Sequence, residues 1–437
     1  MSNFITIATN EFRHFARSPF KVLFLILFVF TAIYGLQNGY SLFKNQTEEI
    51  AKAQEADAET KETALGYFKE LEEGNTPARD ITQPMWALYF APVTAVKSPS
   101  LLMPFTIGQA QEFPYYKRVT EWSTTFDNDL AEELGNPEHL ASGQLDFSFV
   151  VLYLLPVLLI VLLFNVGGLE QDLNFDRLIR VNSLSRSKWL LARFSFYIIL
   201  IAVLLLVVML PYAAMTGALK TDFSAFAKLF LFLLLYLGIW SSVLFFINFT
   251  GRGSTNQALK MVCVWLVFCI VIPGAVHQVA SLKYPPNYMS EYTDAKRDKT
   301  NDIWYMQPDS IYTKLVALYP ELKETKQGKD TVVNQGTMYD TSSALVNDLM
   351  KNTAEGIEQE FEEKNQFINN SYWINPVTFF QNKMNAIAAN DYYAYKAFRD
   401  KIQEKISGKV EYRLFDSWEE KPITKERYQT YLETLND

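Results

Sequence analysis

Five long apolar blocks constrain this chain more than any other feature of its sequence. Each is about as long as the roughly 20 residues that a helix needs to cross a bilayer. None holds an acidic residue in its middle, and none shows the regular polar stripe of a water-soluble helix. We therefore predict an α-helical polytopic membrane protein with about five transmembrane helices. The predicted spans are residues 20–42, 146–166, 194–215, 226–249 and 258–280.

The charges between the blocks predict how the chain is oriented. The first block is interpreted as an uncleaved anchor, because Glu11 lies before it and no A-x-A-like cleavage site follows it. With the amino terminus in the cytoplasm, the short inner segments hold ten basic and four acidic residues. The two large outer segments, 43–145 and 281–437, then have net charges of −9 and −5. Short, basic inner loops are typical of bacterial plasma membrane proteins, so we predict a cytoplasmic amino terminus in the inner membrane.

The first extracytoplasmic segment divides into a helix and a loop. Residues 43–75 are rich in Ala, Glu and Lys, so they are expected to extend the first span outward until Gly74-Asn75. Residues 81–120 carry five prolines among many aromatic residues, which predicts an irregular loop packed on the membrane surface or on the second segment. Interfacial packing explains this loop, and a binding site is the alternative. The candidates for such a site are Trp86, Tyr89, Tyr115 and Tyr116.

The second extracytoplasmic segment is predicted to be mainly helical. Residues 341–370 and 376–408 both carry apolar residues at helical spacing, and Asn375-Pro376 is a good helix start. After residue 280 no sixth apolar block follows, so the whole of 281–437 is expected outside.

Several classes of function find no support in the sequence. The net charge of −8 argues against nucleic-acid binding. The three histidines and two cysteines form no metal-binding pattern, and no G-x-S-x-G or G-x-x-x-x-G-K-[ST] motif occurs. We therefore expect no enzyme activity, no resident cofactor and no ATP hydrolysis by this chain alone.

The predicted cytoplasmic loop 167–193 carries an unusual charge pattern. Its acidic residues come first and its basic residues follow, and Ser185 can cap the helix that enters the third span. A short charged helix between two spans can be pushed by a partner, whereas anchoring by positive charge is the alternative interpretation. The residues that a partner could contact are Glu170, Asp172, Arg177, Arg180, Ser185, Arg186 and Lys188.

The amino end, residues 1–19, is amphipathic. As a helix it would gather Phe4, Ile5, Phe12 and Phe15 on one face. Arg13 and Arg17 would lie apart from that face, where they can meet lipid phosphates. This pattern is typical of an interfacial helix that lies along the inner leaflet.

These features together resemble an ABC-2-type transporter permease. That family has an elbow helix before the first span and a coupling helix between the second and third. Its loop often reads acid-x-acid-x-Gly-Thr-Leu, followed by Pro-x-Ser-Arg and a Lys. Here Glu170 and Asp172 match the acids, and Ser185, Arg186 and Lys188 match the later part. Asn174-Phe175 replace the Gly-Thr pair.

The chain is also similar to one ABC-2 subgroup with large extracytoplasmic domains of unknown function. Members share a run that corresponds here to residues 136–146 (NPEHLASGQLD) and 149–156 (FVVLYLLP). The family usually has six spans, whereas this sequence shows five. Either the sequence stops before a sixth span, or this member lacks one.

The resemblance implies a function and a set of partners. The chain would be the membrane permease subunit of an ATP-driven exporter, in a homo- or heterodimer of permeases. A separate ABC ATPase subunit would hold the ATP and Mg. The spans lack charges that would select an ion, which marginally favours lipid-like or peptide cargo. The alternative is a non-transporting sensor or mechanotransmission subunit that acts on a periplasmic partner through its extracytoplasmic domains.

Overall fold

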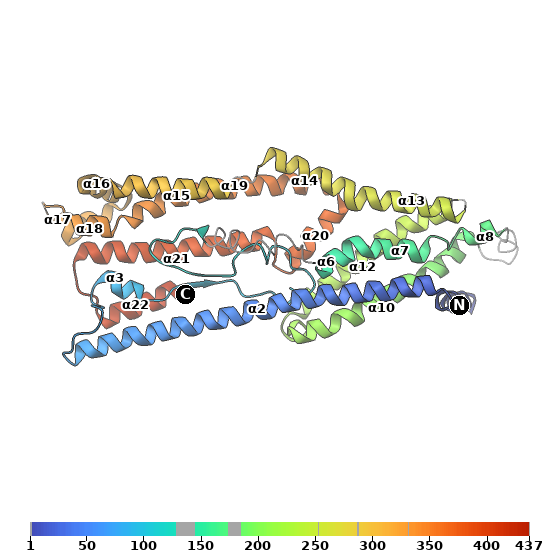
Figure 1. Cartoon of the computed structure of the whole chain (residues 1–437), viewed down its shortest axis with the longest axis horizontal. Helices are drawn as coiled ribbons and strands as arrows, with labels where there is room; N and C mark the ends of the chain where they lie inside the picture. The colour runs from blue at the N-terminus through green and yellow to red at the C-terminus, as the bar shows by residue number, and fades with distance from the viewer. Residues whose placement is uncertain are drawn as a thin grey trace.

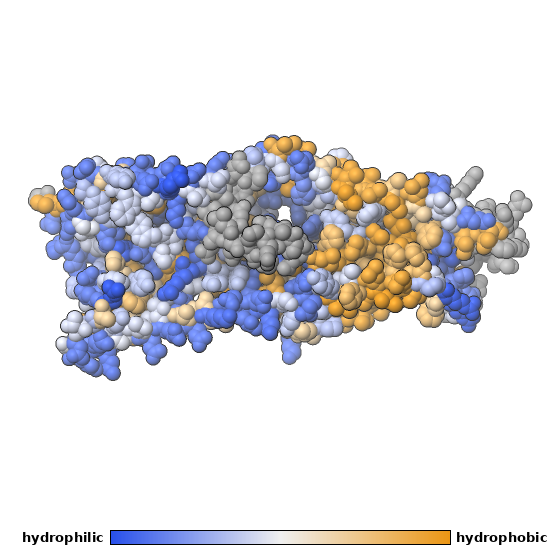
Figure 2. Space-filling view, viewed as in Figure 1, coloured by the Kyte–Doolittle hydropathy of each residue, from blue (hydrophilic) through white to orange (hydrophobic). Residues whose placement is uncertain are grey.

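The computed structural model describes residues 2–127, 145–173, 185–251, 253–285, 288–330 and 332–436. Within these ranges the chain is mainly helical, and its one sheet is a two-stranded ribbon. The molecule is elongated, with a helical bundle at one end and a second helical domain at the other (Figure 1). The second domain is here called the ectodomain, after the predicted orientation of the chain. On the visible face, apolar surface covers the bundle and lies between more hydrophilic surface at either end (Figure 2).

Four helices are long and apolar enough to cross a membrane: α2 (Pro19–Glu72), α10 (Arg186–Met215), α12 (Phe223–Thr250) and the continuous helix Ser254–Lys283. The last comprises α13 (Ser254–Leu266), the π-helical turn η2 (Val267–Val271) and α14 (Ile272–Lys283). These four confirm the prediction of a helical membrane protein. The remaining predicted span forms a shorter apolar helix, Phe147–Leu163, so the span count of about five stays a prediction. That helix comprises α6 (Phe147–Phe149), η1 (Val150–Leu154) and α7 (Leu155–Leu163).

Helix α2 runs from the bundle into the ectodomain without interruption. Its 54 residues correspond to a length of about 80 Å at 1.5 Å per residue. Gly74, with φ +79°, ends the helix, and the Asn75 N–H donates to the carbonyl of Glu70 over 2.8 Å. The predicted helical extension of the first span and its stop at Gly74-Asn75 are therefore confirmed, whereas its outward direction stays a prediction.

The ectodomain core is built on α21 (Tyr392–Glu419), whose buried cations reach several neighbouring segments. Arg399 pairs with Glu358 of α19 (Ser343–Asn370). Lys409 donates to the carbonyls of Ala91 and Val119, each over 3.1 Å. These bonds attach the segment that follows α2 to the tail of the chain.

The segment after α2 is less irregular than the sequence predicts. It contains the short helix α3 (Pro84–Tyr89) and the antiparallel strands β1 (Thr94–Val96) and β2 (Tyr116–Arg118). The prolines do prevent long elements, because these are the only ones in the described part of the segment. It packs against α21, which is one of the two predicted surfaces.

The tail is mainly helical, as predicted, but its predicted helix 376–408 is wrong in one respect. The chain forms α20 (Pro376–Ile387) and α21 as two separate helices. Ala389 takes a φ of +52°, and the Asp391 side chain caps α21 by accepting from the Ala394 N–H. Asn390 is fixed between them, because its carbonyl accepts from the Gln109 N–H over 2.9 Å. The other tail elements are α15 (Tyr288–Trp304), α16 (Pro308–Leu318), η3 (Pro320–Glu324), α17 (Lys326–Lys329), α18 (Gln335–Asp340) and α22 (Lys425–Asn436).

Candidate coupling site at the loop end of the bundle

One end of the bundle, here called the loop end, gathers the elements that the sequence marked for contact with a partner. It comprises α1 (Ser2–Ala16), α8 (Leu169–Asp172), the start of α10 and the turn between α12 and α13. Figure 1 shows the N-terminus and α8 together at this end, remote from the ectodomain. The small helix α11 (Ala218–Thr221) connects the C-terminus of α10 to the N-terminus of α12, at the other end of these two helices from the loop end.

A buried ion pair fastens α1 to α10 at the loop end. Arg193 Nε donates to Glu11 Oε2 over 2.5 Å, and Arg193 Nη2 donates to Glu11 Oε1 over 3.3 Å. Tyr197 adds a hydrogen bond from its hydroxyl to Glu11 Oε1 over 2.8 Å. The two charged side chains are 8% and 4% exposed, so the pair is largely removed from water. A geometry of this kind ties two helices together firmly.

Lys21 extends this cluster to two further helices. Its Nζ, at the start of α2, donates to the carbonyl of Leu162 over 2.8 Å and to Asn165 Oδ1 over 3.1 Å. It also approaches the Tyr197 hydroxyl at 3.3 Å. Helices α1, α2 and α10 and the end of α7 therefore share one buried polar network, here called the Glu11 network.

Two adjacent glycines bring the start of the loop against the α12–α13 turn. A Cβ at Gly167 would lie 2.9 Å from the carbonyl oxygen of Asn248, and one at Gly168 would lie 2.6 Å from the nitrogen of Ser254. The Gly167 N–H donates to Asn248 Oδ1 over 3.0 Å. Only residues without a side chain can approach so closely, so the start of the loop lies in direct contact with the α12–α13 turn.

The described loop residues that the sequence singled out lie around this contact. Asp172 Oδ2 accepts from the Ser254 N–H over 3.1 Å, and Arg186 Nη2 donates to the carbonyl of Asn248 over 3.4 Å. Ser185 precedes α10 but makes no capping bond, since its hydroxyl lies 3.2 Å from that of Ser187. Lys188 is exposed. Arg177 and Arg180 lie outside the described residues, and so does the side chain of Glu170.

The amino-terminal segment is a helix as expected, but its packing was only partly anticipated. Phe15 is buried against Phe196 and Tyr197 of α10, whereas Phe12 is 55% exposed. Arg13 and Arg17 are exposed, as an interfacial helix requires. The side chains of Phe4 and Ile5 are among those that the structure does not describe.

The Glu11 network does not follow from the charge pattern of the sequence, in which Glu11, Lys21 and Arg193 count only toward the orientation of the chain. One signal could have revealed it. Glu11 lies three residues after Ala8 and four before Phe15, on the apolar face of α1. A carboxylate on that face needs a cation inside the bundle.

The aromatic candidates of the ectodomain do not converge on one site. Trp86 and Tyr89 lie on α3, where the Arg79 guanidinium stacks on the Trp86 ring at 4.4 Å. Tyr115 and Tyr116 pack on each other at the start of β2. These contacts therefore place the candidates on two separate elements, and the choice between packing and a binding site stays a prediction.

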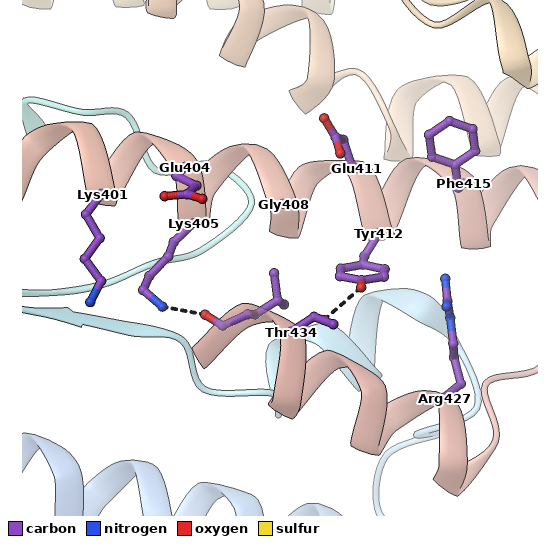
Figure 3. Close-up of a pocket in the computed structure, with 10 residues that line it drawn as sticks. Lys401, Glu404, Lys405, Gly408, Glu411, Tyr412, Phe415, Arg427 and Thr434 are labelled. Carbon is purple, nitrogen blue, oxygen red and sulfur yellow. Dashed lines mark hydrogen bonds between the residues drawn. The ribbon is translucent and has the colours of Figure 1, made fainter. Parts of the chain in front are cut away.

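A groove of about 490 Å³ lies between α21 and α22 in the ectodomain (Figure 3). Two hydrogen bonds join α21 to α22 across it: Lys405 Nζ donates to the carbonyl of Leu435 over 2.6 Å, and Tyr412 pairs with Thr434 over 2.8 Å. Arg427 at its rim forms an ion pair with Asp416 at 2.9 Å. These contacts show that the groove lies along the packing interface of α21 and α22.

Comparison with known proteins identifies one region of similarity. Residues 290–433 match the family model described as "Domain of unknown function (DUF3526)", which covers most of the tail from α15 to α22. No curated protein matches the chain. No solved structure matches it either.

Proposed function

We propose that this chain is the membrane permease subunit of an ABC-2-type, ATP-driven transporter. A separate ATPase subunit would bind ATP and Mg and would contact the loop end. In this proposal the loop end faces the cytoplasm and the ectodomain lies outside the plasma membrane. Two permease copies would form the transport unit, and the direction would be export.

The observation that carries the proposal is the way the loop end connects to the spans. A partner that pushes residues 169–190 would act on α12 and α13 through the Gly167–Gly168 contact. It would act on α1, α2 and α7 through Arg193, because the Glu11 network joins them to α10. One mechanical input at this end can therefore reorient most of the bundle.

A second function is favoured by helix α2. A single helix with buried residues in both the bundle and the ectodomain, such as Phe28 and Phe68, can transmit movement between them. The chain would then be a mechanotransmission subunit that acts on an extracytoplasmic partner without transport. Ala56→Pro, at an exposed position between the two cores, would break this connection, and Ala56→Ser is its matched control.

Affinity purification of the tagged full-length chain from native membranes in mild detergent tests the first proposal. We expect a soluble protein with a Walker A lysine to co-purify in near-equal amount. Reversal of Arg177 and Arg180 to Glu should abolish this association while the chain still inserts into the membrane. The control is the double reversal of Lys220 and Lys323, two exposed residues remote from the loop end.

The possible outcomes separate the two functions. An ATPase that remains bound to the Arg177 and Arg180 variant, with normal activity, would show that the loop is not its contact. A stable extracytoplasmic partner, with no ATPase in any detergent, would favour mechanotransmission. The second function would be supported if the extracytoplasmic partner no longer responds to the Ala56→Pro chain but still responds to the Ala56→Ser chain.

A further inference from the structure

Helix α20 is the part of the tail that enters the core of the bundle. Val377, Phe380 and Met384 are at most 2% exposed, and they belong to the same apolar cluster as the spans. The helix contacts α12 and both π-helical turns, η1 and η2. Figure 1 shows α20 where the ectodomain meets the bundle. It therefore covers the end of the bundle opposite the loop end.

Beneath α20 lies a small group of polar atoms inside the apolar bundle. The Phe380 ring packs on Tyr236 of α12 with centroids 4.9 Å apart. Tyr236 donates its hydroxyl to the carbonyl of Leu152 over 2.5 Å, and Cys269 Sγ lies 3.9 Å from the same oxygen. Cys269 is a free thiol and only 2% exposed.

Two prolines explain why such polar atoms are present in the spans. Pro156 and Pro273 follow η1 and η2, and proline cannot donate to the carbonyl four residues earlier. For Pro156 that carbonyl belongs to Leu152, which Tyr236 therefore satisfies. π-Helical turns and freed carbonyls weaken a helix locally, so both spans can bend at the depth where α20 contacts them.

The two ends of α20 are held very differently. At its C-terminal end, Asn390 is bonded to another segment: its Nδ2 donates to the carbonyl of Thr106 over 2.9 Å, and its carbonyl accepts from the Gln109 N–H over 2.9 Å, although its Oδ1 is buried without a partner in the described part of the chain. At its N-terminal end, Asn375 Nδ2 and Thr378 Oγ1 are buried without a hydrogen-bond partner in the described part of the chain. Both residues are at most 2% exposed.

Buried polar groups without partners raise the free energy of the conformation that contains them. Those at the N-terminus of α20 would be hydrated if that end left the bundle. Unpartnered polar atoms therefore oppose the seated position of α20 at both ends, but the bonds of Asn390 to Thr106 and Gln109 hold its C-terminal end and provide a pivot there.

We propose that α20 is a lid on the ectodomain end of the bundle, which opens by lifting its N-terminal end. Opening removes Phe380 from Tyr236 and gives water access to Tyr236 and Cys269. The inference goes beyond the proposed function, because the lid moves whether the bundle transports cargo or transmits force.

The native cysteines allow a direct test in the full-length chain, reconstituted in phosphatidylcholine nanodiscs. The exposed Cys263 is first replaced by Ser in every chain, including the parent. The rate at which a charged, water-soluble maleimide labels the protein then reports the access of water to Cys269. Thr378→Val removes one unpartnered hydroxyl, so the closed lid should be favoured and labelling should slow about five- to tenfold. Phe380→Leu loses ring packing on Tyr236 and should accelerate labelling several-fold.

Thr434→Val in α22 is the matched control, because that hydroxyl is exposed and already bonded. Its labelling rate should equal that of the parent. The lid proposal is refuted if the Cys269 labelling rates of Thr378→Val and Phe380→Leu both lie within twofold of the parent rate. Should Thr378→Val fail to fold, an unchanged rate in folded Phe380→Leu would by itself refute the proposal.

Discussion

The Glu11 network makes a quantitative prediction about the loop end. Glu11→Ala removes a carboxylate that accepts from Arg193 Nε, Arg193 Nη2 and the Tyr197 hydroxyl. Arg193, 7% exposed, would keep the carbonyl of Val166 as a partner at 2.8 Å. Because a buried charge is left without its counter-charge, we expect the free energy of unfolding to fall by about 3–5 kcal/mol.

Removing both charges should cost much less than removing one. The double variant Glu11→Leu and Arg193→Met replaces the ion pair with apolar side chains of similar size. Such replacements of buried pairs are often nearly neutral, so we expect it to lie within about 1 kcal/mol of the parent. Measured against the single variants Glu11→Leu and Arg193→Met, the coupling energy between the two positions would then be at least about 3 kcal/mol.

The assay is reversible unfolding of the purified full chain in mixed micelles, followed by circular dichroism as the denaturing detergent is increased. Glu49→Ala is the control, because Glu49 pairs with Lys52 at 2.7 Å but both side chains are largely exposed. That variant should change stability by less than about 1 kcal/mol. A loss below about 1 kcal/mol for Glu11→Ala, or additive effects in the double variant, would refute the reasoning.

Two further predictions follow from the packing of single residues. Gly168→Ala should destabilise the loop end in the same assay, because the new Cβ would meet the backbone of Ser254 at 2.6 Å. Gly356→Ala, in α19, has open space around it and should stabilise the chain by about 0.5–1 kcal/mol. Burial lowers the pKa of Lys409 to about 8 from 10.5, so the unfolded chain binds more protons between these values and stability should rise with pH across that window. In Lys409→Met, the rise in the free energy of unfolding between pH 7.5 and pH 10.5 should be smaller than in the parent by up to about 3 kcal/mol. An identical pH dependence in the parent and the variant would contradict the assignment.

The sequence by itself determined the elements whose cause is local. Apolar runs of bilayer length predict helical spans, because in lipid every backbone polar group must be satisfied within the segment. Gly74 stops α2 and Asn375-Pro376 starts α20 for equally local reasons, a positive φ and an N-cap. The charge pattern of the predicted cytoplasmic loop directed attention to the loop end, where Asp172 and Arg186, two of the described members of that set, contact the α12–α13 turn.

Only the tertiary structure decided which distant residues meet. Glu11 and Arg193 are 182 residues apart, and no periodicity within either helix specifies that they pair. The helix predicted over 376–408 breaks because Thr106 and Gln109, from the other ectodomain segment, hold Asn390 in place. Lys409 is buried because carbonyls of Ala91 and Val119 reach it across the fold. Local patterns fix which segments become helices, whereas partners for buried polar groups depend on how those helices are brought together in space.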